Sequence, residues 1–389
     1  MEIPQIVFEY LHCFLKHEPA PDEIKQLNET TLNDMYSFSK KHDLAHLLAD
    51  ILHKNSAWPD NSEIKKKFLQ ERNLAVYRYE QMHYEYQEIC DVLNAAEILF
   101  LPLKGAVIRT FYPESWMRTS CDIDILVSQE NLQRSDEIIK DKLSYTYHER
   151  GDHDISLFAP SGVHLELHYQ LGTDSAKPEE AAVLQRIWDT VTREEGSLPY
   201  RCSMLDEYFY CYHISHIVKH LKCGGCGVRP ILDTWILNHN LAYNAQKREE
   251  LLQEAGLLKA AKAIERLAEI WFSGAEADEI SGALGEYILL GGVYGSKDNE
   301  RAVVLSRKTN KFAYLCSRLF MPYKEMACRY PTVKKWPVLY PFFVVGRLFL
   351  LFKKGTKDRA LNELNQTVAA DGEKINNVAK LLKELDLKA

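Results

Sequence analysis

The sequence predicts an α+β fold, in which a small mixed-sheet module is flanked by N-terminal and C-terminal helical regions. Apolar residues recur every three or four positions through residues 1–95 and again after residue 178, which is typical of helices packed on a core. Between residues 96 and 175, short apolar segments separated by turn residues indicate strands and short helices instead. The 389 residues are 46% hydrophobic and 26% charged, which is the composition of a globular protein.

These shifts in pattern divide the chain into four parts. We expect an N-terminal helical region (1–95), the mixed-sheet module (96–175), a helical domain on the other side of a cleft (176–300), and a basic, apolar helical segment with a polar tail (301–389). In the first part, residues 63–95 contain neither glycine nor proline, so they predict one or two long helices.

Charge and cysteine content narrow the class of protein. The formal charge of -7 argues against a protein that coats nucleic acid with its whole surface, and we find no strong nucleic-acid signal. Nine scattered cysteines, an odd number, do not form the dense framework of a secreted scaffold. Glu9 and Lys16 interrupt any signal-peptide core, so we expect a cytoplasmic protein.

The module from residue 96 to 175 alternates extended and helical segments. In chain order we expect a strand at 98–103, a helix at 105–111, a strand at 121–127, a helix at 130–143, an extended segment at 144–149, and a hairpin of 155–158 with 163–171 around the turn 159–162.

Two strands of this module carry carboxylates on a single face. Side chains alternate along a strand, so Asp122 and Asp124 project to the same side, and a divalent cation would relieve their repulsion. In 163–171 the alternation is complete, with Glu166 and His168 on the polar face. If the two strands are neighbours, three acids converge on a two-metal site. An exposed acidic strand edge is the alternative.

Phosphate-binding groups precede the first acidic strand. Lys104 and Gly105 close a strand and open a helix, where free N–H groups favour phosphate and glycine allows its close approach. Arg118 lies in a loop four residues before Asp122, where its guanidinium can bind phosphate oxygens in a fork.

The chain resembles the uncharacterised nucleotidyltransferase family of the DNA polymerase β-like superfamily. The resemblance rests on three motifs in this order: the Leu-Lys-Gly segment, the Arg-x-x-x-Asp-x-Asp strand and the Leu-Glu-Leu-His strand. The resemblance implies a nucleotidyltransferase fold with two Mg²⁺ ions and an NTP as substrate. It assigns Asp122, Asp124 and Glu166 as metal ligands and catalytic carboxylates, with Glu166 nearest the nucleophile. Cys121 stands where family members commonly carry glycine.

The resemblance extends more loosely into the helical domain. We expect helices at 208–221, 230–241 and 247–271. The family's helical motifs place His216, Arg229 and Asp233 near the site as accessory residues, with His168 from the module.

Two histidines and two cysteines near the end of the first of these helices allow two interpretations. His216, His220, Cys223 and Cys226 have the residue types of a zinc site. The glycines between the two cysteines equally mark a helix end, with the histidines facing the cleft.

The segment 301–354 is strongly basic, with twelve Lys or Arg residues and a single acid, Glu325. Within it, 336–352 is apolar but too short to span a bilayer. We expect either buried helices or an interfacial segment, and the basic residues predict an anionic partner or a membrane surface. The apolar spacing of 378–387 predicts a last amphipathic helix.

The sequence thus predicts a cytoplasmic, Mg²⁺-dependent nucleotidyltransferase that moves an NMP from an NTP, such as ATP, to an unidentified hydroxyl-bearing acceptor. The alternatives are a non-catalytic protein that binds nucleotide or a partner on the same fold, and a membrane-peripheral protein. Replacing Asp124 with Asn should abolish turnover and leave the melting temperature unchanged or higher, because carboxylate repulsion is relieved.

Overall fold

The computed structural model describes residues 2–25, 27–55, 58, 62–172, 176–306, 323, 326, 327, 330–350 and 372–387. The N-terminal region forms the helices α1 (Ile3–Lys16), α2 (Asp22–Lys25), α3 (Glu29–Lys41), α4 (Ala45–Lys54) and α5 (Glu63–Ala95). The glycine-free stretch is therefore one helix of 33 residues, whose N-cap Ser62 accepts a hydrogen bond from the Lys65 amide.

The module that follows holds a five-stranded mixed sheet, as predicted. Its elements are β1 (Phe100–Pro102), α6 (Lys104–Ile108), η1 (Arg109–Phe111), η2 (Ser115–Met117), β2 (Asp122–Val127), α7 (Leu132–Leu143), β3 (Thr146–Arg150), β4 (Asp154–Phe158) and β5 (His164–His168). The strand order is β1-β2-β5-β4-β3, with β2 and β5 parallel and the other pairs antiparallel. The last strand ends at His168, three residues earlier than expected.

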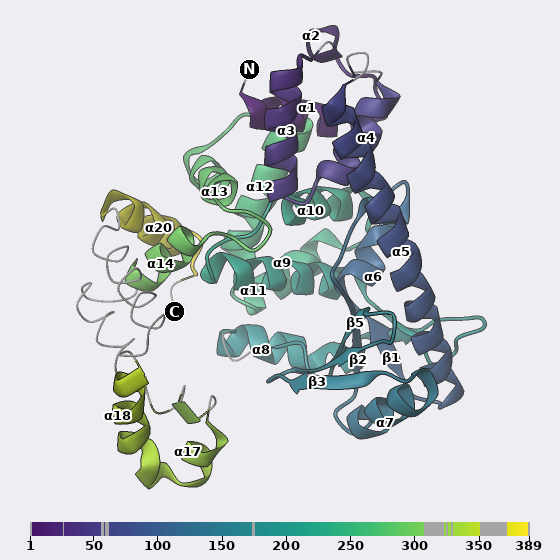
Figure 1. Ribbon diagram of the computed structural model, residues 1–389, viewed down its shortest axis with the longest axis vertical. Helices are drawn as coiled ribbons and strands as arrows, with labels where there is room; N and C mark the ends of the chain where they lie inside the picture. The colour runs from purple at the N-terminus through teal and green to yellow at the C-terminus, as the bar shows by residue number, and fades with distance from the viewer. Residues whose placement is uncertain are drawn as a thin grey trace.

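One face of the sheet is apolar and covered by helices. Ile123 of β2 and Leu165 of β5 pack with Ile89 of α5 and Ile139 of α7 in one buried cluster. Figure 1 shows α5 running along the sheet, with α7 beside it at the lower end. The burial of this face leaves the acidic residues of β2 and β5 on the other face.

The next part of the chain is helical apart from a small hairpin. It consists of α8 (Pro178–Gln185), η3 (Arg186–Asp189), β6 (Val191–Arg193), β7 (Cys202–Met204), α9 (Asp206–Lys222), α10 (Arg229–Asn240), α11 (Ala245–Glu254), α12 (Leu258–Ser273), α13 (Glu279–Leu290) and α14 (Lys297–Ser306). The expected helix at 247–271 is two helices, because Gly256 adopts a positive φ of 65° and breaks it.

Helices from the N-terminal region and helices that follow the sheet share one hydrophobic core. The Phe8 ring of α1 stacks on Trp271 of α12 with ring centroids 4.6 Å apart. Residues from α1, α4, α9, α10 and α12 belong to the same buried cluster.

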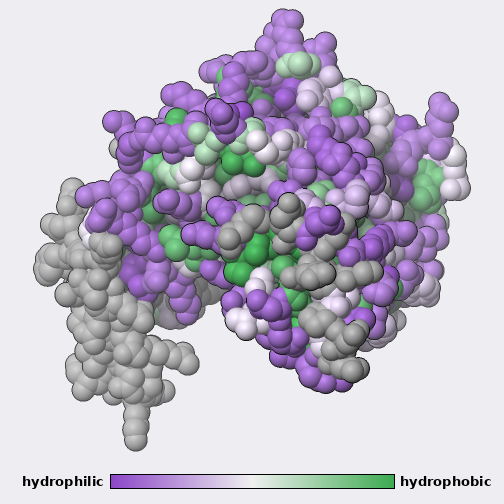
Figure 2. Space-filling model, turned by 90° about the horizontal axis from the view of Figure 1, so that it is seen from above, coloured by the Kyte–Doolittle hydropathy of each residue, from purple (hydrophilic) through white to green (hydrophobic). Residues whose placement is uncertain are grey.

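The face in Figure 2 is mostly hydrophilic, with hydrophobic residues gathered mainly in one central area. The domain boundaries drawn from the sequence stay predictions.

The C-terminal elements are α17 (Pro331–Lys335), η4 (Pro337–Leu339), α18 (Tyr340–Leu350) and α20 (Gly372–Glu384). The expectation of buried helices at 336–352 is wrong for several described side chains: Trp336, Val338, Phe342 and Val345 are 51–73% exposed. Each helix within the described ranges is too short or too polar to cross a bilayer. The last amphipathic helix is confirmed as α20, which buries Val378, Leu381 and Leu382.

Most of the basic side chains of the segment 301–354 lie outside the described ones. Of its twelve basic residues, Arg301, Lys334 and Lys335 have described side chains, and Arg301 pairs with Asp298 at 3.0 Å. The anionic partner of this segment stays a prediction.

Candidate active site

Three carboxylates meet on the polar face of the sheet. Because β2 and β5 are parallel neighbours, Asp122 lies opposite His164 and Asp124 lies opposite Glu166. The neighbouring hydrophobic positions point into the core on the far side. The strand pairing assumed from the sequence is therefore present, and Glu166 lies on the same face as the two aspartates.

Lys104 lies between two of these acids. Its Nζ atom is 2.6 Å from Asp124 Oδ1 and 3.7 Å from Glu166 Oε2. Burial alone would lower the pKa of Lys104, but the surrounding carboxylates, Asp124 first, raise it well above its usual value. Its backbone has a positive φ of 39°, which is strained for a residue other than glycine. The strained turn holds a permanently charged ammonium against the acids.

His168 completes the contacts around Asp124. Its Nε2 atom lies 2.8 Å from Asp124 Oδ1 and 3.4 Å from Glu166 Oε2, and its side chain is 3% exposed. Burial lowers the pKa of His168, but the hydrogen bonds to Asp124 and Glu166 outweigh burial and raise it above its usual value.

The two aspartates consequently have different ionisation behaviour. Burial and the nearby charge of Asp124 raise the pKa of Asp122 to about 6. Burial also acts on Asp124, but Lys104 and His168 hold its pKa well below the usual range. The hydrogen bond from His168 is the main cause that lowers the pKa of Glu166. Asp122 is therefore the carboxylate whose charge is least compensated by the protein.

The donor set fits a hard divalent cation. Two groups of side chains have ligand atoms within 4.8 Å of one another: Asp122 with His164 and Glu166, and Asp124 with Glu166 and His168. Glu166 belongs to both groups. Carboxylate oxygens are the ligands that Mg²⁺ prefers, and the Lys104 ammonium already occupies a cation position beside Asp124.

The loop that carries Arg118 is fixed to α10. Arg118 Nη2 is 3.1 Å from Asp233 Oδ2, and Asp233 also accepts a 2.8 Å hydrogen bond from the Tyr112 hydroxyl. Arg229 Nη1 pairs with Asp43 and donates to the Thr119 carbonyl at 3.1 Å. The motif at residues 229–233 thus acts on the loop rather than directly on the acids.

Two of the predicted phosphate-binding residues have surroundings that differ from those expected. The Arg118 guanidinium, expected to face a phosphate, is only 8% exposed and binds Asp233 instead. A Cβ atom on Gly105 would lie 2.7 Å from Arg118 Nη1 and 3.1 Å from Ser120 Cβ. Glycine at this position therefore allows the Arg118 loop to approach the chain, and the approach of a phosphate there stays a prediction.

A cavity of about 350 Å³ separates the acids from α9 and α10. It contacts all three carboxylates, together with Lys104, Arg118 and Arg229. Across it lie three histidines of α9: His213, His216 and His220. Burial lowers the pKa of His216 well below its usual value, with Lys104 adding to the effect, so its ring is neutral. The cavity is therefore lined by acids on one wall and by neutral histidines and cations on the others.

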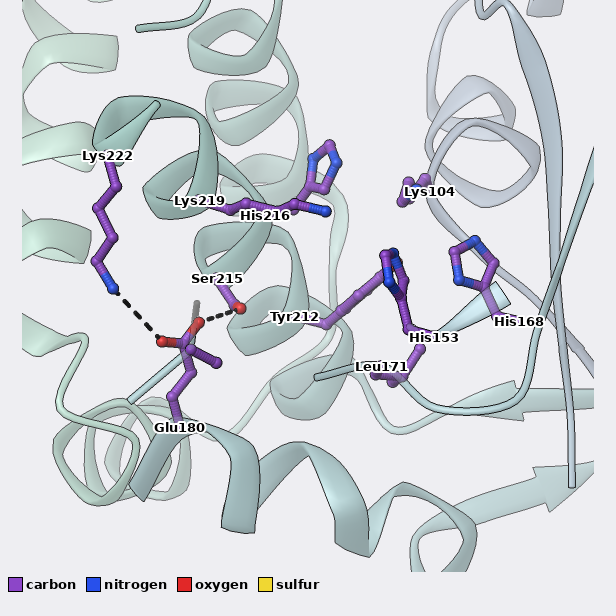
Figure 3. Close-up of a pocket in the computed structure, with 11 residues that line it drawn as sticks. Lys104, His153, His168, Leu171, Glu180, Tyr212, Ser215, His216, Lys219 and Lys222 are labelled. Carbon is purple, nitrogen blue, oxygen red and sulfur yellow. Dashed lines mark hydrogen bonds and ion pairs between the residues drawn. The ribbon is translucent and has the colours of Figure 1, made fainter. Parts of the chain in front are cut away.

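A smaller side pocket opens next to this cavity. Figure 3 shows Lys104, His153 and His168 facing Tyr212, His216 and Lys219 of α9. At the far end, Glu180 accepts a 2.5 Å hydrogen bond from Ser215 and lies 3.9 Å from Lys222. Lys219 lines both the pocket and the main cavity.

The helix-end interpretation fits the histidines and cysteines of α9 better than zinc. The His216 and His220 rings lie against each other with centroids 4.6 Å apart, but within the described part of the chain neither joins a metal-ligand group with a cysteine. Cys223 is exposed and Cys226 is buried. Gly224 and Gly225 both have positive φ and end the helix.

Several residues that line the cavity were not found from the sequence. Lys219 and Tyr212 belong to a helix whose apolar spacing gave no reason to single them out, although Lys219 follows His216 by three residues and so lies on the same helical face. Tyr294 comes from a loop distant in sequence, and no motif marks it. Asp43 does not line this cavity, but it pairs with Arg229, which does, and no motif marks it either.

Comparison with known proteins identifies the family of this chain. A family model described as "Uncharacterised nucleotidyltransferase" matches residues 28–273, more than half of the chain, and the match includes all three carboxylates and the 229–233 motif. No curated protein and no solved structure matches the chain. With the acidic strand pair and the matched segment in agreement, this chain belongs to the uncharacterised nucleotidyltransferase family.

Proposed function

We propose that this protein is a metal-dependent nucleotidyltransferase that transfers an NMP from an NTP to a hydroxyl-bearing acceptor. The observation that supports the proposal best is the pair of ligand groups that share Glu166, on one face of two parallel strands and open to a cavity. Such a pair suits two divalent ions, and the family match agrees with nucleotidyl transfer.

In this proposal Asp122, Asp124 and Glu166 hold Mg²⁺. Bound Mg²⁺ would supply positive charge to the triphosphate and to the attacking oxygen. Burial and the charge of Asp124 raise the pKa of Asp122, and a bound cation would oppose both by favouring its charged form.

The cations around the cavity suit the triphosphate. Lys104 is bound to Asp124 in the absence of metal, and a bound cation would free its ammonium for a phosphate oxygen. Arg118 adds positive charge from a fixed position, because Asp233 orients its guanidinium. Lys219 reaches the cavity from the opposite wall.

The α9 wall is the side we assign to the acceptor. Its His216 is uncharged, so the ring can accept a hydrogen bond from a hydroxyl without repelling the nearby lysines. The module and α9 then hold the two substrates on opposite walls of one cavity.

The test follows the α-phosphate. Wild-type protein and Asp122→Asn are incubated with Mg²⁺, each of the four NTPs labelled at the α- or γ-phosphate, and a desalted cell extract as the source of acceptors. We expect wild type alone to transfer the α label, and not the γ label, to a larger product. EDTA should abolish the transfer.

The same experiment separates the proposal from its main alternative. A non-catalytic nucleotide-binding protein would gain thermal stability with an NTP and Mg²⁺ but transfer no label. Transfer of the γ label instead would indicate phosphoryl transfer and contradict the proposal.

A further inference from the structure

A glycine-rich turn outside the family match carries an exposed aromatic residue to the mouth of the cavity. The turn at residues 291–295 joins α13 to α14, and its Val293 and Tyr294 line the cavity that contains the acids. The Tyr294 side chain is 72% exposed, which is unusual for an aromatic ring beside a buried charged site.

The backbone under this ring is held firmly. Val293 donates its amide to the Lys41 carbonyl at 3.1 Å, and Ser296 donates to the Gly224 carbonyl at 3.2 Å. Gly292 and Gly295 are hydrogen-bonded to each other in both directions, at 3.2 and 2.8 Å. The turn is therefore tied both to the end of α3 and to the end of α9.

Glycines make this contact close. A Cβ atom on Gly295 would lie 2.8 Å from the Gly225 amide nitrogen, and one on Gly292 would lie 3.0 Å from the Lys41 carbonyl oxygen. On the facing segment, a Cβ on Gly227 would lie 3.2 Å from Val293 Cα. Side chains at these positions would push the turn outward and move the ring away from the cavity. The ring is therefore preorganised although its residue is largely exposed.

The ring lies beside the acidic strand. The Tyr294 hydroxyl is 3.5 Å from Cys121 Sγ, and Cys121 directly precedes Asp122. If the α-phosphate of a nucleotide binds at Asp122, the base lies one ribose away from it, which is compatible with a base at the Tyr294 ring. An exposed, fixed aromatic ring at that place offers a stacking surface, because every base has a π-face.

We propose that Tyr294 is the stacking platform for the base of the NTP, an inference that rests on the function proposed above. The hydroxyl is directed at Cys121, so recognition comes from the face of the ring and not from hydrogen bonds to the base edge. Stacking increases with the area of the base, and purine NTPs should therefore bind more tightly than pyrimidine NTPs.

The test compares two ligands and three variants. Equilibrium dissociation constants are measured in Mg²⁺ for a non-hydrolysable ATP analogue and for inorganic tripolyphosphate, which has no base. Tyr294→Ala should weaken binding of the ATP analogue about 5- to 150-fold and leave tripolyphosphate binding within about twofold. Tyr294→Phe keeps the ring and should bind both ligands like wild type.

Tyr77→Ala is the matched control, because Tyr77 is a similarly exposed tyrosine, 64% exposed, on α5, and it is not among the residues that line the cavity. It should change neither dissociation constant. Unchanged tripolyphosphate binding also shows that Tyr294→Ala is folded.

Two results would overturn the inference. If Tyr294→Ala binds the ATP analogue as tightly as wild type, the stacking role is wrong and the proposed function stands. If wild type binds neither the ATP analogue nor tripolyphosphate, the proposed function fails and the stacking role fails with it.

Discussion

Isosteric Asp→Asn changes at positions 122 and 124 should alter the stability of the metal-free protein in opposite directions. The two carboxylates lie two residues apart on the same face of β2. The two variants therefore make the same chemical change at neighbouring positions, and only the charges around each position differ. Asp124 is bound by Lys104 at 2.6 Å and by His168 at 2.8 Å. Asp122 instead has mainly like charge near it.

The magnitude follows from these surroundings. Asp124→Asn removes a 2% exposed carboxylate and leaves buried cations behind, a change that costs about 3 to 5 kcal/mol for a buried pair. Glu166 lies 3.7 Å from Lys104 and compensates in part, so we expect about 3 kcal/mol. From the sequence we expected Asp124→Asn to be as stable as wild type or more stable. Because the charge of Asp124 is paired, we now expect this variant to be less stable.

For Asp122→Asn we expect the free energy of unfolding to increase rather than decrease. Its folded pKa of about 6 lies above the usual 3.8, so the folded state binds the proton more tightly, and stability falls as pH rises from about 4 to 6. A shift of about two units corresponds to roughly 3 kcal/mol at pH 7 and above. Asp122→Asn removes this penalty and should stabilise the protein by up to that amount at pH 8, with no gain below pH 4.

The assay is urea unfolding in EDTA at pH 8 and at pH 5, for wild type and both variants. A depressed folded pKa gives Asp124 its stabilising effect above the usual aspartate pKa, so the loss in Asp124→Asn should persist at both pH values. The reasoning is refuted if both variants change the free energy of unfolding in the same direction at pH 8. Both variants should lose the stabilisation that Mg²⁺ and NTP give to wild type.

Three further predictions concern other parts of the molecule. Gly105→Ala should destabilise the protein by about 1 to 3 kcal/mol, because the added Cβ would lie 2.7 Å from Arg118 Nη1. This cost should exceed the better helix propensity of alanine, and greater stability of the variant in urea unfolding would contradict the prediction. Lys219→Gln should weaken Mg²⁺-NTP binding about tenfold, as measured by calorimetry, because Lys219 lines the cavity. The stability of the protein should change little, since no ion-pair partner of Lys219 is seen among the described residues. Equal affinity would remove Lys219 from the site. If residues 301–354 bind an anionic surface, the protein should sediment with anionic vesicles at low salt and less at moderate salt, and no sedimentation at either would count against a membrane partner.

Much of the fold was predictable because local patterns report local structure. The absence of glycine and proline from residues 63–95 predicts long helical structure, but it does not decide between one helix and two. The alternation in β5 is enough to assign its polar face. The break at Gly256 was missed, because one glycine within a helical pattern is compatible with either a continuous or an interrupted helix.

Strand alternation fixes side-chain orientation within one strand, so the residue types of the acidic site and the face on which each acid lies can be read without a structure. Which acid is paired depends instead on contacts between distant segments. Lys104 and His168 reach Asp124 and not Asp122 because the first residue of α6, with its positive φ, and the parallel register of β5 direct them there. Likewise, packing brings Tyr294, which is more than 100 residues away from Asp122, to the site, and no local pattern encodes such a contact. The family motif placed Arg229 near the site, but only the packing of α10 shows that it holds the Arg118 loop.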